Sequence, residues 1–111
     1  MQQLSAKLES LRATILAKAT SVLQTPTFKK SAKKLKPNQK SELDIAIKAL
    51  MAKPSLGEQK KGDLASLRVY KFKMNRQRTL LGYSFDDGTL TLELMALGSH
   101  ENFYRDLKRH T

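Results

Sequence analysis

The chain of 111 residues contains no cysteine and no tryptophan, and it has only two histidines. Without cysteine, the fold has neither disulfide bonds nor thiolate metal sites. The two imidazoles, His100 and His110, stand ten positions apart without a matching pattern of acidic residues, so they make a poor metal site. We therefore expect a protein that holds no metal ion and uses no cofactor.

Long apolar runs are also missing. No segment approaches the roughly 20 apolar residues that a membrane-spanning helix needs, and the N-terminus lacks the continuous apolar stretch of a secretion signal. The sequence therefore predicts a cytoplasmic protein without a membrane partner. Its length of 111 residues suffices for one domain that buries about two-thirds of the surface its unfolded chain exposes.

Acidic residues are scarce, since 21 Lys and Arg stand against 10 Asp and Glu and give a net charge of +11. The excess lies in residues 25–78, which carry fifteen basic and four acidic side chains, whereas the flanking segments are close to neutral. A charge of this size favours a polyanionic partner such as nucleic acid, an acidic protein or an anionic surface.

The N-terminal residues have the apolar spacing of an amphipathic helix, which we predict over residues 2–19. Its apolar stripe consists of Leu4, Leu8, Leu11 and Ile15. The stripe packs either on the domain's own core or on a partner, including a second copy of the chain. We assign residues 1–21 to an N-terminal helical extension and 22–111 to the main domain. An alternative explanation of the extension is that translation starts at Val22 or Leu23.

A helical hairpin is predicted over residues 26–52. Thr25 can cap a helix that starts at Pro26 and stops before Pro37. The second helix covers about residues 40–52 and ends before Pro54, because the residue that precedes a proline disfavours helical geometry. The first helix is rich in lysine. Its apolar face consists of Phe28, Ala32 and Leu35, and the lysines lie on its other sides.

After a polar loop, the spacing of apolar residues changes from helical periodicity to alternation. Three antiparallel strands are predicted, at residues 68–74, about 78–85 and 89–97, with a turn at Asp86-Asp87-Gly88. A further short strand is expected at residues 21–24, and a short last helix at 101–109. The predicted fold class is α+β, with N-terminal helical segments packed on a small antiparallel sheet and a short C-terminal helix.

The alternation also assigns residues to the two faces of the sheet. Lys71 and Lys73 lie on the open face, and by the same count Arg78 shares that face with Leu80 and Gly82. The core face is expected to take Tyr70, Phe72, Met74, Leu81, Tyr83, Leu90, Leu92, Leu94 and Ala96.

The order of these elements resembles the RelE/ParE superfamily of type II toxin-antitoxin toxins. The resemblance covers about residues 22–110 and is carried by the segments TPTFKKSAKKL, GDLASLRVYKFK and ALGSHENFYRDLKR. In the RelE-like branch it implies an mRNA interferase, an endoribonuclease that enters the ribosome and cleaves mRNA there with the RNA 2′-hydroxyl as the nucleophile and without a metal ion. It also implies a cognate antitoxin as partner.

Such a cleavage needs a base for the 2′-hydroxyl, positive charge beside the pentacovalent phosphate and an acid for the departing 5′-oxygen. Lys71 and Lys73 fall where the RelE-like branch keeps paired lysines on a strand. That branch often has an arginine three residues before the tyrosine of the next strand, where this chain has Leu80. Arg78 shares the strand face of Leu80, and its guanidinium can grip two phosphate oxygens, so it is the candidate for this role.

His100 follows the last strand, where several ribosome-dependent members keep a catalytic histidine or arginine, and an imidazole can exchange a proton near neutral pH. Tyr104 lies one helical turn later and can stack on an RNA base or orient the scissile phosphate. The resemblance therefore implies a catalytic set of Lys71, Lys73, Arg78, His100 and Tyr104. The other lysines expected to bind RNA are Lys29, Lys30, Lys33, Lys34, Lys60 and Lys61.

Two other functions fit the same sequence. A ParE-like toxin inhibits DNA gyrase by binding rather than by cleavage, and both the N-terminal helix and the displaced arginine favour it. An inactive relative would act as a nucleic-acid-binding or scaffold protein, with its lysines serving only as a hydrated surface.

Overall fold

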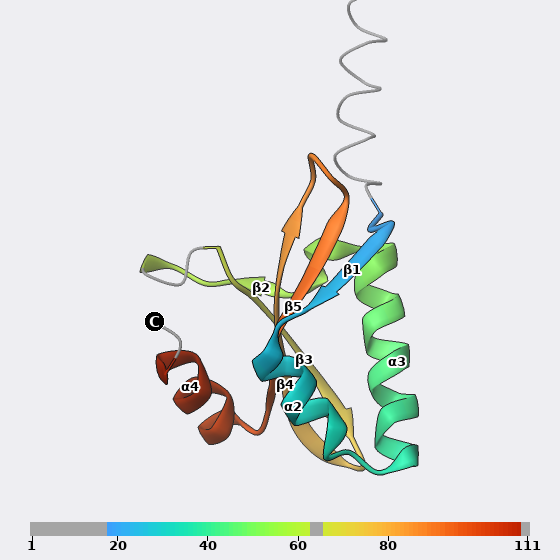
Figure 1. Cartoon of the computed structure of the whole chain (residues 1–111), viewed down its shortest axis with the longest axis vertical. Coiled ribbons are helices and arrows are strands. Elements are labelled where there is room, and N and C mark those ends of the chain that lie inside the picture. The colour runs from blue at the N-terminus through green and yellow to red at the C-terminus, as the bar shows by residue number, and fades with distance from the viewer. Residues whose placement is uncertain (1–17, 63–65, 110–111) are drawn as a thin grey trace, which may run out of the picture.

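A computed structural model of the chain describes residues 18–62 and 66–109 (Figure 1). The elements in these residues are β1 (Ser21–Gln24), α2 (Pro26–Lys33), α3 (Pro37–Ala52), a 3₁₀ turn (Pro54–Leu56), β2 (Glu58–Gln59), β3 (Arg68–Met74), β4 (Gln77–Asp86), β5 (Thr91–Gly98) and α4 (His100–Arg109). Most of the predicted N-terminal helix lies outside the described residues; its last two, Lys18 and Ala19, are not helical. None of the described helices is long and apolar enough to cross a membrane.

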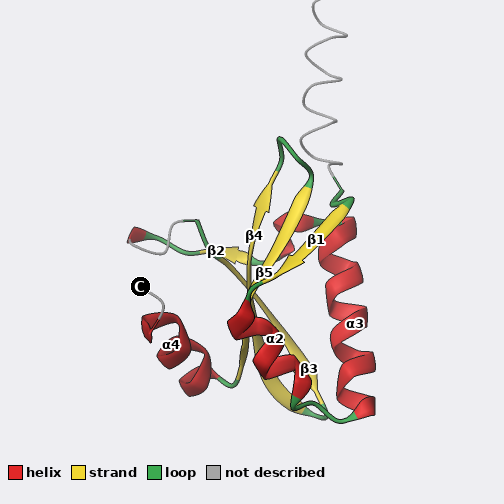
Figure 2. Ribbon diagram, viewed as in Figure 1, coloured by secondary structure: helices red, strands yellow, loops and turns green. Residues whose placement is uncertain are grey.

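The five strands form one sheet in the order β1-β5-β4-β3-β2. All neighbours pair antiparallel except β1, which runs parallel to β5 with Ser21 opposite Thr91. Helices α2 and α3 lie on one face of this sheet and α4 lies on the other (Figures 1 and 2). The structure confirms the α+β class. It differs from the prediction in the direction of β1, which depends on a pairing between residues 70 positions apart.

Each face of the sheet has its own hydrophobic core. Beneath α2 and α3 the buried residues include Phe28, Leu43, Leu50, Leu81, Tyr83, Leu92 and Leu94. Beneath α4 they are Leu67, Val69, Leu80, Ala96 and Phe103. Each fully buried leucine or phenylalanine contributes about 1.5–3 kcal/mol by leaving water. The smaller core therefore fixes α4 on the sheet.

Part of the face that was predicted to be open is covered by α4. Leu80 and Gly82 are buried there, and an added Cβ on Gly82 would lie only 2.7 Å from Phe103 Cζ. The strand alternation gave the correct face for both residues, but it held no information about a helix that covers this face. The prediction that Leu80 and Gly82 face solvent is therefore wrong.

A β-bulge in β5 moves Ala96 to the opposite face from the predicted one. Gly82 pairs with Ala96 and Tyr83 pairs with Leu94, so Met95 is an extra residue between the two pairs. Leu94 consequently packs under α2 and α3, whereas Ala96 packs under α4. A single inserted residue reverses the alternation, so the prediction for Ala96 is wrong.

Several element boundaries also differ from the predicted ones, and the structure has one strand that was not predicted. Strand β5 begins at Thr91, so Leu90 lies in the turn before it and not in the strand as predicted. Helix α3 begins at Pro37 rather than near Lys40, because proline suits the first helical position and the Gln39 side chain accepts a hydrogen bond from the Lys36 N–H at 2.9 Å. Strand β2 was expected to be loop. It has two residues, Glu58 and Gln59, and it is defined only by its pairing with β3.

Candidate functional site

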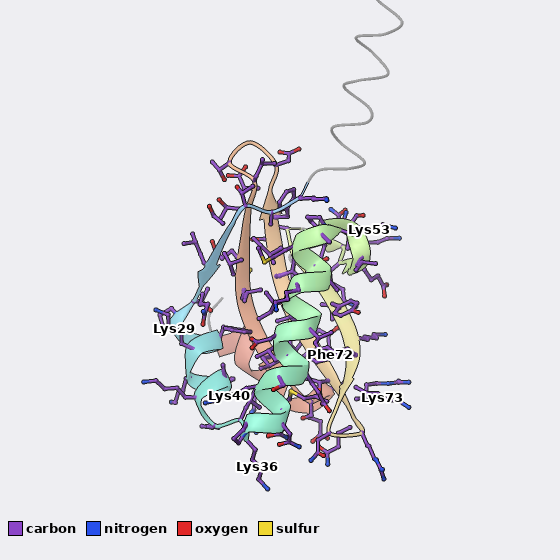
Figure 3. The ribbon with its side chains drawn as sticks, turned by 90° about the vertical axis from the view of Figure 1, so that its right-hand side faces the viewer. Lys29, Lys36, Lys40, Lys53, Phe72 and Lys73 are labelled. Atoms are coloured by element: carbon purple, nitrogen blue, oxygen red, sulfur yellow. The ribbon has the colours of Figure 1, made fainter. Side chains whose placement is uncertain are left out.

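The hairpin of β3 and β4 places three cations on one face of the sheet. Lys71 pairs with Leu80, and Lys73 pairs directly with Arg78, so the register assigns all three cations to the face that α4 partly covers. Lys71, Lys73 and Arg78 are exposed, because α4 covers β4 and β5 nearer the middle of the sheet. Figure 3 shows Lys73 pointing outward, while Phe72 next to it lies towards α3.

The turn of this hairpin is tight and is bonded to helix α3. Asn75 and Arg76 form its two central residues with φ of 53° and 66°, the left-handed geometry of a tight hairpin turn. The backbone N–H of Asn75 donates a hydrogen bond to the carboxylate of Glu42 on α3. The cross-strand pair of Lys73 and Arg78 therefore stands on an anchored hairpin.

Helix α4 brings His100 and Tyr104 side by side. The helix begins at His100, and the N–H of Phe103 bonds to the Ser99 carbonyl at 2.8 Å. Because residues four apart share a helical face, the two rings lie 5.0 Å apart between centroids with an interplanar angle of 59°. His100 is exposed, whereas Tyr104 is half-buried and also meets the Phe103 ring edge-on at 5.0 Å.

Lys60 joins this pair from a distant part of the chain. Its Nζ lies 5.9 Å from the centroid of the Tyr104 ring, a cation–π distance. The Lys60 N–H bonds to the Leu67 carbonyl at 2.9 Å, just beyond the ladder of β2 and β3. The sequence had grouped Lys60 with lysines that bind RNA at a distance from the reaction, and no sequence signal predicted its contact with Tyr104.

The loop that carries Lys60 depends on two buried or half-buried side chains. The Tyr83 hydroxyl accepts a hydrogen bond from the Gly57 N–H at 2.8 Å and donates one to the Pro54 carbonyl. The guanidinium of Arg68 donates to the Gly57 carbonyl at 2.8 Å. Burial raises the pKa of Tyr83, although its hydrogen bond from Gly57 and the charge of Arg68 act against this shift. Tyr83 therefore stays a neutral donor at physiological pH.

The cations and the ring pair belong to the same end of the sheet. Leu80 pairs with Lys71 on one side and with Gly98 on the other, so one row crosses β3, β4 and β5. His100 begins α4 two residues after Gly98. The pair of Lys73 and Arg78 lies two residues further along β3 and β4, beyond the end of β5 at Gly98.

The other lysines predicted to bind RNA are exposed but do not form one patch. Lys29 on α2 lines a cavity next to β1, whereas Lys30 on α2 and Lys34 at the end of that helix line another cavity next to α4. In Figure 3, Lys29 projects from α2, and Lys36 and Lys40 project near the start of α3. Lys61 is exposed in the loop after β2. In residues 18–62 and 66–109, no group of three or more His, Cys, Asp and Glu side chains gathers as metal ligands would.

A mostly antiparallel sheet with two helices on one face and a terminal helix on the other is the fold expected from the resemblance to the RelE/ParE superfamily. Residues 22–108 match the sequence profile of the ParE-like toxin of type II bacterial toxin-antitoxin system family. The chain belongs to this family and is a type II toxin. No curated protein sequence matches it.

Solved structures with the same fold include RelE proteins and their complexes. A chain of the toxin-antitoxin complex RelBE2 from Mycobacterium tuberculosis is 22% identical, with 72% of this chain and 90% of that chain covered and a TM-score of 0.59. A chain of the intact E. coli RelBE complex is 17% identical, with 73% and 96% covered and a TM-score of 0.59. The isolated E. coli RelE toxin is 18% identical, with 84% and 100% covered and a TM-score of 0.58. At these identities the likeness shows a shared fold.

Proposed function

We propose that this toxin is a ribosome-dependent mRNA interferase, which a cognate antitoxin protein neutralises. The observation that carries the proposal is the pairing of Lys73 with Arg78, next to Lys71, on the face of the sheet that also carries α4 with His100 and Tyr104. The RelBE structures are complexes of a toxin with its antitoxin, which supports an antitoxin partner for this chain.

The proposed reaction is the attack of an RNA 2′-oxygen on the adjacent phosphorus, with loss of the 5′-oxygen of the next nucleotide. It forms a 2′,3′-cyclic phosphate and a free 5′-hydroxyl, so one proton must leave the 2′-hydroxyl and one must reach the 5′-oxygen. His100 is the proposed proton carrier, because an imidazole can take or give a proton near neutral pH. Tyr104 positions the His100 ring and contacts the RNA.

The three cations supply the positive charge that the pentacovalent phosphate requires. Arg78 can present two N–H groups to the phosphate oxygens, and Lys73 stands opposite it in the strand register. This pairing supports Arg78 as the counterpart of the arginine that the RelE-like branch keeps near the strand tyrosine.

The second candidate function is inhibition of DNA gyrase by binding. The family to which the chain belongs is named for its likeness to ParE toxins, and its helical hairpin carries many exposed lysines. A binding function of this kind needs neither His100 nor Arg78, so variants of these residues separate the two candidates.

The test is expression from a tightly controlled promoter, with mapping of cellular mRNA 5′ ends and a supercoiling assay of gyrase in parallel. We expect cuts in phase with codons and normal gyrase. His100→Ala should reduce cutting by about 100-fold or more, the scale of general acid–base catalysis. The exposed position of His100 predicts that this variant folds normally, which circular dichroism checks.

His110→Ala is the matched control, because it removes the other imidazole of the chain, and it should cut like the wild type. Undiminished cutting by His100→Ala would remove His100 from the mechanism. Intact mRNA together with failed supercoiling would favour the gyrase candidate.

A further inference from the structure

Helix α4 also lines a cavity with residues on the side away from His100 and Tyr104. At 100° per residue, Asn102 and Arg105 lie on roughly the opposite side of the helix from that ring pair. They line a cavity of about 410 Å³ whose other lining residues come from α2, from the segment after it and from the ends of β3 and β5. The proposed catalytic set does not include any residue of this cavity.

The cavity has a cationic rim and an apolar floor. Lys30 from α2, Lys34 at the end of that helix and Arg105 from α4 supply three positive charges, and none of the lining residues is acidic. Its other lining residues are Thr27, Ser31, Leu35, Met74, Leu97, Gly98 and Asn102. Met74 and Leu97 are buried and Leu35 is half-buried, so these three form the inner surface.

Arg105 is partly positioned before any ligand arrives. Its guanidinium donates a hydrogen bond to Asn102 Oδ1 at 2.8 Å, which limits the freedom of the side chain while other N–H groups stay available. Lys30 lies in α2 and Lys34 is the residue that ends this helix, and both side chains line the cavity. Phe103 is fully buried beneath α4 and fixes this helix on the sheet, and Arg105 lines the same cavity as Lys30 and Lys34.

We propose that this cavity is a subsite for one nucleotide of single-stranded RNA, with a phosphate on Lys30, Lys34 and Arg105 and the base against Leu35 and Leu97. Its volume lies within the range of about 300–1,000 Å³ that small ligands occupy. A phosphate pairs with the cations that line the cavity. The flat face of a base covers the apolar floor, which a phosphate alone leaves uncovered.

The location of the cavity links it to the proposed cleavage site. Gly98 lines the cavity and His100 follows two residues later, so both sites adjoin the same crossing from β5 to α4. An RNA strand whose scissile phosphate lies at His100 can continue past this crossing into the cavity. This inference rests on the proposed function, to which it adds a binding position for a nucleotide next to the cut.

Binding is tested with the full chain and a fluorescent hexanucleotide whose riboses are 2′-O-methylated, so that it cannot be cleaved. Anisotropy should show that Lys34→Glu and Arg105→Ala each weaken binding by about tenfold or more at low salt. Lys34→Arg should retain the wild-type affinity. Lys48→Glu is the matched control, because it makes the same charge change at an exposed lysine of α3 outside the cavity, and it should weaken binding by less than about threefold.

Nuclear magnetic resonance tests the apolar floor. AMP should shift the methyl signals of Leu35, Met74 and Leu97, and inorganic phosphate should leave these signals in place. The subsite would be overturned if Lys34→Glu and Lys48→Glu lost the same affinity for the hexanucleotide, or if the methyl signals did not respond to AMP. The subsite would also be overturned if binding of an acidic peptide depended on Lys34 while binding of the hexanucleotide did not. The cavity would then bind a protein partner.

These assays contain no ribosome, so their failure differs from failure of the proposed function. If the wild type cuts mRNA in cells but Lys34→Glu binds the hexanucleotide as Lys48→Glu does, the subsite is refuted and the cleavage stands. If binding depends on Lys34 and Arg105 while cellular mRNA stays intact, the subsite stands and the cleavage is refuted.

Discussion

The Tyr83 hydroxyl is the buried link between the sheet and the loop that carries Lys60. It accepts from the Gly57 N–H and donates to the Pro54 carbonyl, and Tyr83 itself is fully buried. Tyr83→Phe keeps the ring but leaves both backbone groups without this partner. An unsatisfied buried polar group costs about 1–3 kcal/mol, so we expect a loss of about 2–4 kcal/mol in the free energy of unfolding.

This loss is large for a domain of this size, whose total stability is about 5–15 kcal/mol. Urea unfolding followed by circular dichroism measures this loss. The slope of the unfolding free energy against urea concentration should stay unchanged, which shows that only stability has altered. Tyr70→Phe is the control, because it removes a hydroxyl from a half-buried tyrosine of β3 while the ring still stacks on Phe72. The control should change stability by less than about 0.5 kcal/mol.

The same residue predicts a dependence on alkaline pH. Burial raises the pKa of Tyr83 above its ordinary value of 10.0, so the folded chain keeps the phenol neutral where the unfolded chain ionises it. The stability from neutral Tyr83 is therefore fully present below about pH 10 and is lost as the pH rises above that value. The stability gap between wild type and Tyr83→Phe should narrow above about pH 10. A variant within about 0.5 kcal/mol of wild type at neutral pH would refute the reasoning.

Two further substitutions test how α4 and α2 are held. Gly82→Ala places a methyl group 2.7 Å from Phe103 Cζ, so it should cost about 1–3 kcal/mol of stability and lower the melting temperature. Gly98→Ala is the control and should be tolerated, because its Cβ would lie 3.5 Å from Asn102 Cβ, an ordinary contact distance. Equal melting temperatures for the two variants would contradict this close packing. Thr25→Ala removes the hydroxyl that accepts from the Phe28 N–H at 3.2 Å and donates to the Met95 carbonyl at 3.0 Å, so it should cost about 1–2 kcal/mol in urea unfolding. Thr20→Ala, at an exposed threonine, is its control, and a matching loss there would exclude the cap as the cause.

Local signals were sufficient where the physics is local. Thr25-Pro26 predicted the start of α2, and the alternation from Arg68 to Met74 predicted β3 with its correct bounds. Proline geometry also predicted the end of α3 at Ala52. In each case the residues that decide the structure are neighbours in the chain, so composition and spacing contain the information.

Long-range pairings defeated the same approach. Strand β2 has only two residues and exists through its bonds to β3, and the bulge at Met95 is defined by the residues opposite it on β4. The contact of Lys60 with Tyr104 joins segments more than forty residues apart in the chain. None of these features corresponds to a periodic pattern of apolar residues in the sequence.

The sequence by itself determined the absence of cysteine chemistry, the strong positive charge, the α+β class and the strand face shared by Lys71, Lys73 and Arg78. These follow from composition and from the period of two along a strand, which are properties of the chain itself. Only the tertiary structure decided that Lys73 stands opposite Arg78, that α4 covers Leu80 and Gly82, and that Lys60 lies by Tyr104. The physical reason is that register and helix docking minimise the free energy of contacts between distant segments, and no local pattern records which segments meet.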